Sequence, residues 1–394
     1  MMPPLFKYFL APADQVFQKD GKLWLTPIPI SRKPSPENTT TLFNYGDYFT
    51  AVRKFLEKDG FKGFIRALSQ HLGCDVALEE INEIRIFLEK HGEFYHPARI
   101  GTDLQGLNIS LVANVALSDT GKSRIQQEYR LLQKLREDFP FSYLPEVYGL
   151  DSIFIKDDNL ELKIFLGEWF EGYCEFHVSR DPADKTLKIL VWDGQRGNYF
   201  LTADQCRELY RQAAMILTGY YNHQTFEQIS SWHHAAGDFV IRCQHDKLDL
   251  KLITVRQYGS MFVHGQEEQT TPDIPAEHIL LNALLVFFLN LAIRMRLDRL
   301  DGVGKMVWAD TIAVGPTLQG VLDALTLKPP AGRLKVPLAD GFREHLQACT
   351  RKELYELNRA LVATYPLGSA DIPVIKKHLK EHVDDLYSAI QPYG

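Results

Sequence analysis

The sequence is poor in cysteine, and its cysteines follow no pattern typical of a metal site or a disulfide framework. The five cysteines are odd in number, scattered and never in CxxC spacing: Cys74, Cys174, Cys206, Cys243 and Cys349. Scattered cysteines of this kind are typical of reduced thiols in a cytoplasmic protein. We therefore expect a cytoplasmic location and predict no metal site.

Basic residues are not in excess over acidic residues, and this balance indicates which class of partner to expect. The chain has 44 Lys and Arg against 50 Asp and Glu, and its formal net charge is -6. A nucleic-acid-binding surface normally shows as a basic excess or a basic stripe. We therefore expect no nucleic-acid partner.

The sequence also lacks a clean membrane-spanning run. Its most hydrophobic stretch, residues 278–295, is interrupted by Asn282 and Asn290 and contains Arg294 near its end. The stretch falls short of the roughly 20 clean apolar residues that a bilayer span needs. It predicts a buried core helix and no membrane partner. The N-terminal residues have no long apolar core, so we expect no signal peptide.

What is present is a chain of 394 residues with patterns of both strands and helices. Residues 1–92 predict an N-terminal extension with one hairpin, over 16–30, and helices, the last over 78–88. Residues 93–172 are rich in strand patterns and include one helix. Residues 173–394 are mainly helical and include one inserted hairpin. Because strands and helices are segregated along the chain, the predicted class is α+β.

The inserted hairpin is the central feature of the predicted site. Residues 232–259 read WHHAAGDFVIRCQHDKLDLKLITVRQYG. The apolar runs at 239–241 and 248–255, joined by a short charged loop, predict a β-hairpin. Asp238 directly precedes the hairpin, where a loop can present an acid to a ligand. The segment just before it, residues 224–231, is predicted to be helical.

The order and spacing of segments over residues 93–390 resemble the protein-kinase-like fold, and within it the aminoglycoside/choline-type phosphotransferase branch. LVANVAL and the helix after it resemble the third strand and the following helix of the small lobe. FLGEWFEG, residues 165–172, resembles the hinge strand that receives adenine, and WHHAAGDF resembles the catalytic loop. The resemblance implies a two-lobed fold, with an antiparallel-sheet small lobe and a helical large lobe. The helical N-terminal extension precedes both lobes.

In active members of that family, five side chains handle phosphate and magnesium. They are a strand Lys, a helix Glu, a catalytic-loop Asp, an Asn five residues later and a DFG-type Asp. The matching positions hold Asn114, Glu128, Asp238, Cys243 and Gln257. Asn114 cannot neutralise phosphate, and neither Cys243 nor Gln257 supplies a carboxylate for magnesium.

The resemblance therefore implies a degenerate site. Asp238 is its catalytic residue, and Asn114, Glu128, Glu168 and Gln257 are its cofactor-binding residues. We expect a pseudokinase related to phosphotransferases, with a ligand-binding or regulatory role. Its ligand would be a nucleotide or another small molecule, and the sequence leaves the oligomeric state open.

The first alternative is an active ATP-dependent phosphotransferase that uses ATP and magnesium to phosphorylate a hydroxyl of a small molecule. Asp238 would then orient the acceptor hydroxyl, and acids such as Asp193 or Asp310 would hold magnesium. The lost positive charge would come from other cations, for which the sequence offers Lys122, Lys251 and Arg256.

Two local patterns have both a functional and a structural interpretation. ALSDTGKS, residues 116–123, has the context of a phosphate-binding P-loop with Lys122 and Ser123, which would indicate a nucleotide hydrolase. In the structural interpretation Asp119 caps the helix or forms the turn, and Lys122 lies in solvent. The histidines at 233, 234 and 245 suggest a metal site near Asp238, but their spacing matches no known ligand pattern, which favours polar loop packing.

Overall fold

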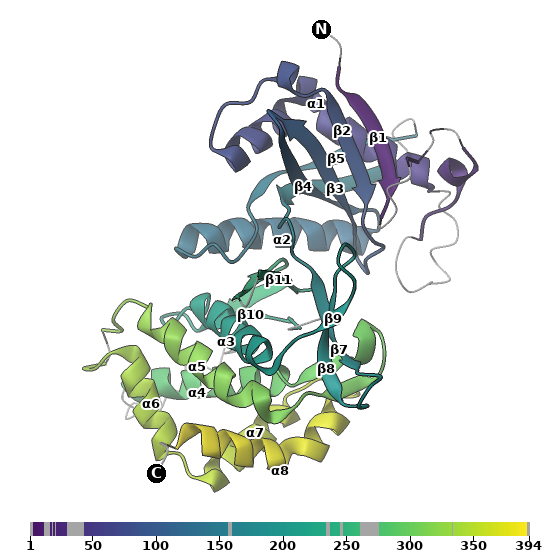
Figure 1. The fold of residues 1–394 in the computed structure, drawn as a ribbon. Coiled ribbons are helices and arrows are strands. Elements are labelled where there is room, and N and C mark those ends of the chain that lie inside the picture. The colour runs from purple at the N-terminus through teal and green to yellow at the C-terminus, as the bar shows by residue number, and fades with distance from the viewer. Residues whose placement is uncertain are drawn as a thin grey trace. The chain divides into compact units, whose positions relative to one another are not determined.

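The computed structural model describes residues 3–11, 16, 17, 19, 21–29, 43–156, 160–233, 237–244, 247–260, 276–332 and 334–391. The chain divides into two compact units. Unit 1 comprises residues 1–138 and 145–171, and unit 2 comprises residues 139–144 and 172–394. Strands and helices occur in both units (Figure 1), which confirms the predicted α+β class. Residues 1–92 cluster with the strands that follow them, whereas the sequence pattern placed a boundary at residue 92.

Unit 1 is built on a six-stranded sheet in the order β1-β2-β3-β4-β6-β5. The strands are β1 (Leu5–Leu10), β2 (Glu83–Leu88), β3 (His96–Leu104), β4 (Leu107–Ala116), β5 (Val147–Ile155) and β6 (Leu160–Glu168). β1 and β2 are parallel, and every other neighbouring pair is antiparallel. The sheet therefore consists of the predicted antiparallel strands extended at one edge by β2 and β1.

Two helices, α1 (Tyr45–Leu72) and α2 (Asp119–Asp138), pack on opposite faces of this sheet. Successive side chains of a strand point to opposite faces. In β6, Ile164 and Leu166 join the buried cluster that includes α1, whereas the ring of Phe165 lies 5.9 Å from that of Tyr129 on α2. The sheet is thus covered on both sides, and α2 lies on the face that carries Asn114.

Two predictions for the first 92 residues are wrong in the part that the structure describes. Instead of the second strand of a hairpin, residues Lys22–Leu25 form a 3-10 turn, because Trp24 is buried against Tyr8 and Phe49. Several residues of the predicted hairpin, Asp20 among them, lie outside the described residues. The predicted helix over 78–88 is strand β2 from residue 83 onward. Its side chains are buried at every second position, as expected for a strand between two others.

Where the structure describes it, unit 2 contains four small sheets and most of the helices. Its strands are β7 (Glu175–Arg180), β8 (Leu187–Trp192), β9 (Tyr199–Phe200), β10 (Glu227–Ser230), β11 (Phe239–Gln244), β12 (Lys247–Leu252), β13 (Gln257–Ser260), β14 (Leu297–Arg299) and β15 (Met306–Trp308). Its helices are α3 (Ala203–Gly219), α4 (Ala276–Arg294), α5 (Val314–Thr326), α6 (Leu338–Ala348), α7 (Arg351–Ala363) and α8 (Asp371–Ile390). The predicted inserted hairpin is confirmed as β11–β12.

The segment before the hairpin differs from its prediction. Residues 224–231 were expected to be helical, but β10 pairs antiparallel with β13, and Ser230 stands opposite Gln257. The pairing places the two chain segments that flank the hairpin side by side. Tertiary pairing here overrides the local pattern, as is common for short polar strands.

Helix α4 corresponds to the most hydrophobic stretch of the sequence. Within the described residues it is the one helix whose length and composition would allow it to cross a membrane, and 61% of the relevant stretch is buried inside the protein. Its side chains Leu284, Phe288 and Ile293 are fully buried. This burial is what we expect of a core helix.

The C-terminal helix α8 contributes an unusual buried histidine. His382 is fully buried, and its two ring nitrogens have no hydrogen-bond partner among the described residues. Its ring meets that of Trp308 edge to face at 5.5 Å. Burial lowers the pKa of His382 to about 3, and the nearby guanidinium of Arg296 acts in the same direction. His382 is therefore neutral in the folded protein at physiological pH.

We predict that His382 makes unit 2 sensitive to acid. Because its pKa is lower in the folded than in the unfolded state, protons favour the unfolded chain below about pH 6.5. The free energy of unfolding should fall by about 2–3 kcal/mol from this group alone between pH 7 and pH 4.5. His382→Phe should remove that component while leaving stability at pH 7 nearly unchanged, because no hydrogen bond is lost. Urea unfolding at both pH values measures the difference, and equal pH dependence in both proteins would contradict the prediction.

Candidate functional site

Asp238 stands at the start of β11, where the hairpin begins. Its backbone C=O accepts a hydrogen bond from the N–H of Ile253 at 2.8 Å, which continues the β11–β12 ladder past its last pair, Phe239 and Leu252. The backbone of Asp238 is therefore held by the hairpin. Its side chain points into the protein, since no part of the residue is exposed.

The carboxylate of Asp238 is fully engaged by neighbours in unit 2. Arg256 donates from its two terminal guanidinium nitrogens, one to each carboxylate oxygen. The backbone N–H of His233 donates to Oδ2 of Asp238 at 2.8 Å. A buried carboxylate is costly unless it is paired and hydrogen-bonded, and these contacts meet that need. The arrangement places a fixed cation beside the acid.

Gln257 is connected to the same network. Arg256 also donates to the backbone C=O of Ser231 at 3.1 Å, and the hydroxyl of Ser231 donates to Oε1 of Gln257 at 3.0 Å. The structure therefore brings two of the predicted site residues, Asp238 and Gln257, into one hydrogen-bonded group. Gln257 is exposed and supplies an amide instead of a carboxylate.

The other three predicted residues lie in unit 1 and have different neighbours. Glu128 on α2 is buried, and its carboxylate accepts a hydrogen bond from the hydroxyl of Tyr95 at 2.7 Å. Glu168 ends β6, and its Oε2 accepts from the backbone N–H of Glu146 at 3.1 Å. Asn114 is half-buried on β4 and stands opposite Phe165. Glu168 thus joins the end of β6 to the residue that precedes the edge strand β5.

The position five residues after Asp238 is Cys243, on β11. Burial raises the pKa of the Cys243 thiol above its ordinary value. A neutral thiol is a poor ligand for magnesium, which prefers oxygen. Cys243 therefore does not replace the missing asparagine of the resembled family.

The P-loop interpretation finds little support in the geometry. β4, which precedes the segment, has antiparallel neighbours on both sides. The first turn of α2 is closed: the hydroxyl of Ser118 accepts from the N–H of Gly121, and the carbonyl of Phe94 lies against Gly121. Lys122 pairs with Asp119 and Glu161. Ser118 is thus the capping residue instead of Asp119, and Lys122 is ion-paired instead of lying free in solvent.

The acids and histidines suggested as metal ligands show no common centre. Among the residues that the structure describes, no group of three or more His, Cys, Asp and Glu side chains is placed to hold a metal ion. Asp193 accepts hydrogen bonds from the N–H groups of Gln195 and Arg196 in a turn. His234 and His245 lie outside the described residues, and His233 donates a hydrogen bond to Asp238 from its backbone N–H.

A cavity of about 1050 Å³ lies in unit 1, along the outer edge of β1. Residues that line it include Phe6, Tyr8 and Arg53, and no predicted site residue is among its lining residues. The Arg53 guanidinium lies over the ring of Phe6 and pairs with Glu57. The cavity is therefore separate from the candidate site.

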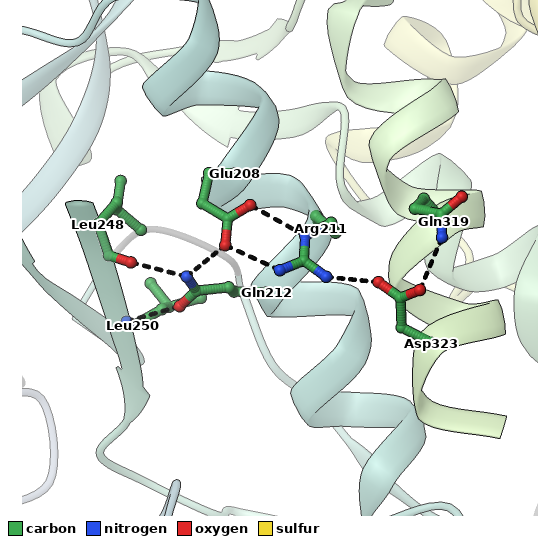
Figure 2. Close-up of polar contacts among 7 residues, drawn as sticks. All are labelled: Glu208, Arg211, Gln212, Leu248, Leu250, Gln319 and Asp323. Carbon is green, nitrogen blue, oxygen red and sulfur yellow. Dashed lines mark hydrogen bonds and ion pairs between the residues drawn. The ribbon is translucent and has the colours of Figure 1, made fainter. Parts of the chain in front are cut away.

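Gln212, on α3, fixes the hairpin from its outer side, as Figure 2 shows. Its side-chain amide donates to the C=O of Leu248 at 2.7 Å and accepts from the N–H of Leu250 at 2.9 Å. The amide thus takes the place of a neighbouring strand on the free edge of β12. Glu208 accepts a second bond from Gln212 and also pairs with Arg211, which contacts Asp323 on α5. The hairpin is in this way tied to two helices.

Comparison with known proteins assigns the chain to no family, so any function has to be inferred from its own residues. No protein-family model matches the chain, and no curated protein matches it. Sequence reasoning identified Asp238 and named Arg256 as a substitute cation, but it missed Tyr95 and Gln212. No local signal indicates these contacts, because Tyr95 lies 33 residues from Glu128 and Gln212 lies 36 residues from Leu248.

We predict that Gln212→Leu weakens the outer edge of β12. The N–H of Leu250 loses its acceptor, and an unmet buried hydrogen bond costs about 1–3 kcal/mol. Hydrogen exchange followed by mass spectrometry should show faster exchange over 247–252. Gln319→Leu is the matched control, because Gln319 is exposed and bonds only Asp323 in the same network. Equal exchange in the two variants would refute the role of Gln212.

We also predict strong coupling between Asp238 and Arg256. Arg256→Met leaves a buried carboxylate without its cation and should lower the free energy of unfolding by about 2–4 kcal/mol, less than for a fully buried pair because Arg256 is partly exposed. Combining it with Asp238→Leu should restore much of that loss. Urea unfolding of both single variants and the double variant measures the coupling. Additive effects would show that the ion pair contributes little.

Proposed function

We propose that the chain is a protein-kinase-like pseudoenzyme related to the aminoglycoside/choline-type phosphotransferases, with a ligand-binding or regulatory role in the cytoplasm. In this proposal unit 1 is the small lobe and unit 2 the large lobe. The order of β4, α2 and β6 supports it, because LVANVAL, the helix after it and the strand that runs into FLGEWFEG follow one another as the resemblance implies. The change of unit after Glu171 also supports it, since the expected hinge segment ends there.

The main support for impaired catalysis is the state of Asp238. To orient an acceptor hydroxyl, a catalytic carboxylate needs an oxygen that can face the substrate. Arg256 and the N–H of His233 instead occupy both oxygens of a fully buried side chain. A magnesium ion would also have to compete with the Arg256 guanidinium for this acid. Each lost transition-state contact costs about 10²–10³ in rate, so several losses leave little transfer.

A ligand-binding role remains chemically reasonable without transfer. Binding needs shape, hydrogen bonds and charge, whereas phosphoryl transfer also needs the magnesium ligands. The proposed ligand is a nucleotide or a small molecule. In unit 2, Gln257 would offer it an amide group in place of a charge.

The proposal predicts no phosphoryl transfer. The full-length protein is incubated with radiolabelled ATP, magnesium and either an aminoglycoside or choline, and labelled product is counted. We expect counts equal to those of the Asp238→Asn variant. Calorimetry with ATP, with and without magnesium, should show no gain in affinity from the metal. Transfer that Asp238→Asn abolishes, or tight magnesium-dependent ATP binding, would overturn the proposal in favour of an active phosphotransferase.

A further inference from the structure

Strand β1 lies at one edge of the six-stranded sheet of unit 1, with β2 as its neighbour on the inner side (Figure 1). The N–H of Leu5 donates to the C=O of Asn82 at 2.9 Å, and the N–H of Ala11 donates to the C=O of Leu88 at 3.0 Å. Because the backbone groups of successive residues in a strand point to opposite sides, the odd-numbered residues of β1 face β2. The even-numbered residues, Phe6 among them, therefore direct their N–H and C=O groups to the outer edge.

Part of this outer edge is already covered by the chain itself. The C=O of Tyr8 accepts a hydrogen bond from the N–H of Phe17 at 2.6 Å, next to an isolated antiparallel bridge between Phe9 and Val16. Among the described residues this pairing reaches no further toward the start of β1. At Phe6 neither outward-facing backbone group has a hydrogen-bond partner among the residues that the structure describes.

The uncovered part of the edge lies beside the cavity of about 1050 Å³, which residues 5–8 of β1 line. Apolar side chains contribute to its wall, among them Phe6 and, from the segment before β2, Leu78 and Ile81. Leu5 and Val16 also line the cavity, and they are 59% and 49% exposed. A cavity of this size can take several side chains of a bound molecule.

We propose that the outer edge of β1 at Phe6 is a docking site for an extended peptide segment of another protein, which adds a strand to the sheet. A peptide backbone matches this edge, because an antiparallel residue opposite Phe6 exchanges both N–H···O=C bonds with it. An apolar small molecule could fill the cavity but would leave both backbone groups of Phe6 to water. The bound segment continues the line of residues 16 and 17, and its apolar side chains contact Leu5 and Val16.

The geometry disfavours a second copy of β1 as the occupant. In a two-fold antiparallel pair centred on Phe6, Pro4 of one copy would stand opposite Tyr8 of the other. That place beside Tyr8 is already taken by Phe17. A short segment from a different protein has no such covering residues and avoids the overlap. The docking site is a property of unit 1 alone and does not depend on the proposed pseudoenzyme function.

The first test uses a library of random twelve-residue peptides displayed on phage, which is panned over the full-length protein. Enriched peptides are synthesised, and their affinities for Phe6→Pro and Phe6→Val are measured by fluorescence anisotropy. Proline removes the outward N–H without breaking the ladder to β2, which uses the neighbours of Phe6. Valine is the matched control, because it keeps the N–H and has a side chain of similar size. The dissociation constant should be about fivefold higher for Phe6→Pro. Equal affinities, or a library that yields no binding peptide, would overturn the docking site.

The second test locates the peptide on the wild-type protein, so it stays decisive even where Phe6→Pro does not fold. Hydrogen exchange is resolved to single residues by electron-transfer fragmentation. Without peptide, the amide of Phe6 should exchange faster than those of Leu5 and Lys7, which face β2. A saturating enriched peptide should slow exchange at Phe6 by about tenfold and leave Lys7 unchanged. Protection confined to other parts of the chain would place the peptide on another surface and refute the proposal.

Discussion

The ion pair between Asp238 and Arg256 joins the two chain segments that flank the β11–β12 hairpin. A carboxylate with no exposed surface is tolerated only with a partner that stays in place, and the guanidinium meets both oxygens. Arg256 follows the hairpin and Asp238 precedes it, so the pair closes the hairpin at its open end. The same guanidinium holds Ser231, which joins β10 to the group. Asp238, the predicted catalytic residue, is therefore also a residue that holds the structure together.

Glu128 in unit 1 is also buried, and the hydroxyl of Tyr95 donates a hydrogen bond to its carboxylate. Both acids that match the resembled family are therefore removed from water and hydrogen-bonded, as a buried carboxylate requires.

Predictions from local pattern succeeded where a segment's own periodicity decided its structure. The helix after LVANVAL, a helix in the N-terminal extension and the β11–β12 hairpin all have strong local signals, and all are present. Predictions failed where pairing with a neighbouring strand determined the structure of a segment. Residues 83–88 contain closely spaced apolar residues that fit either period, and pairing with β1 and β3 selects the strand. Residues 227–230 are polar except for Ile229, and they become a strand because β13 lies beside them.

For the candidate site, the sequence alone determined which side chains are available: one acid before a hairpin, an amide where a metal-binding acid was expected, and a glutamate on a helix after a strand. These follow from order and spacing along the chain. The tertiary structure alone decided which groups face those acids. Tyr95 reaches Glu128, and Gln212 reaches β12, across separations that no local pattern records. Burial then limits what each acid can bind, because a carboxylate removed from water must be hydrogen-bonded by the donors that the fold places beside it.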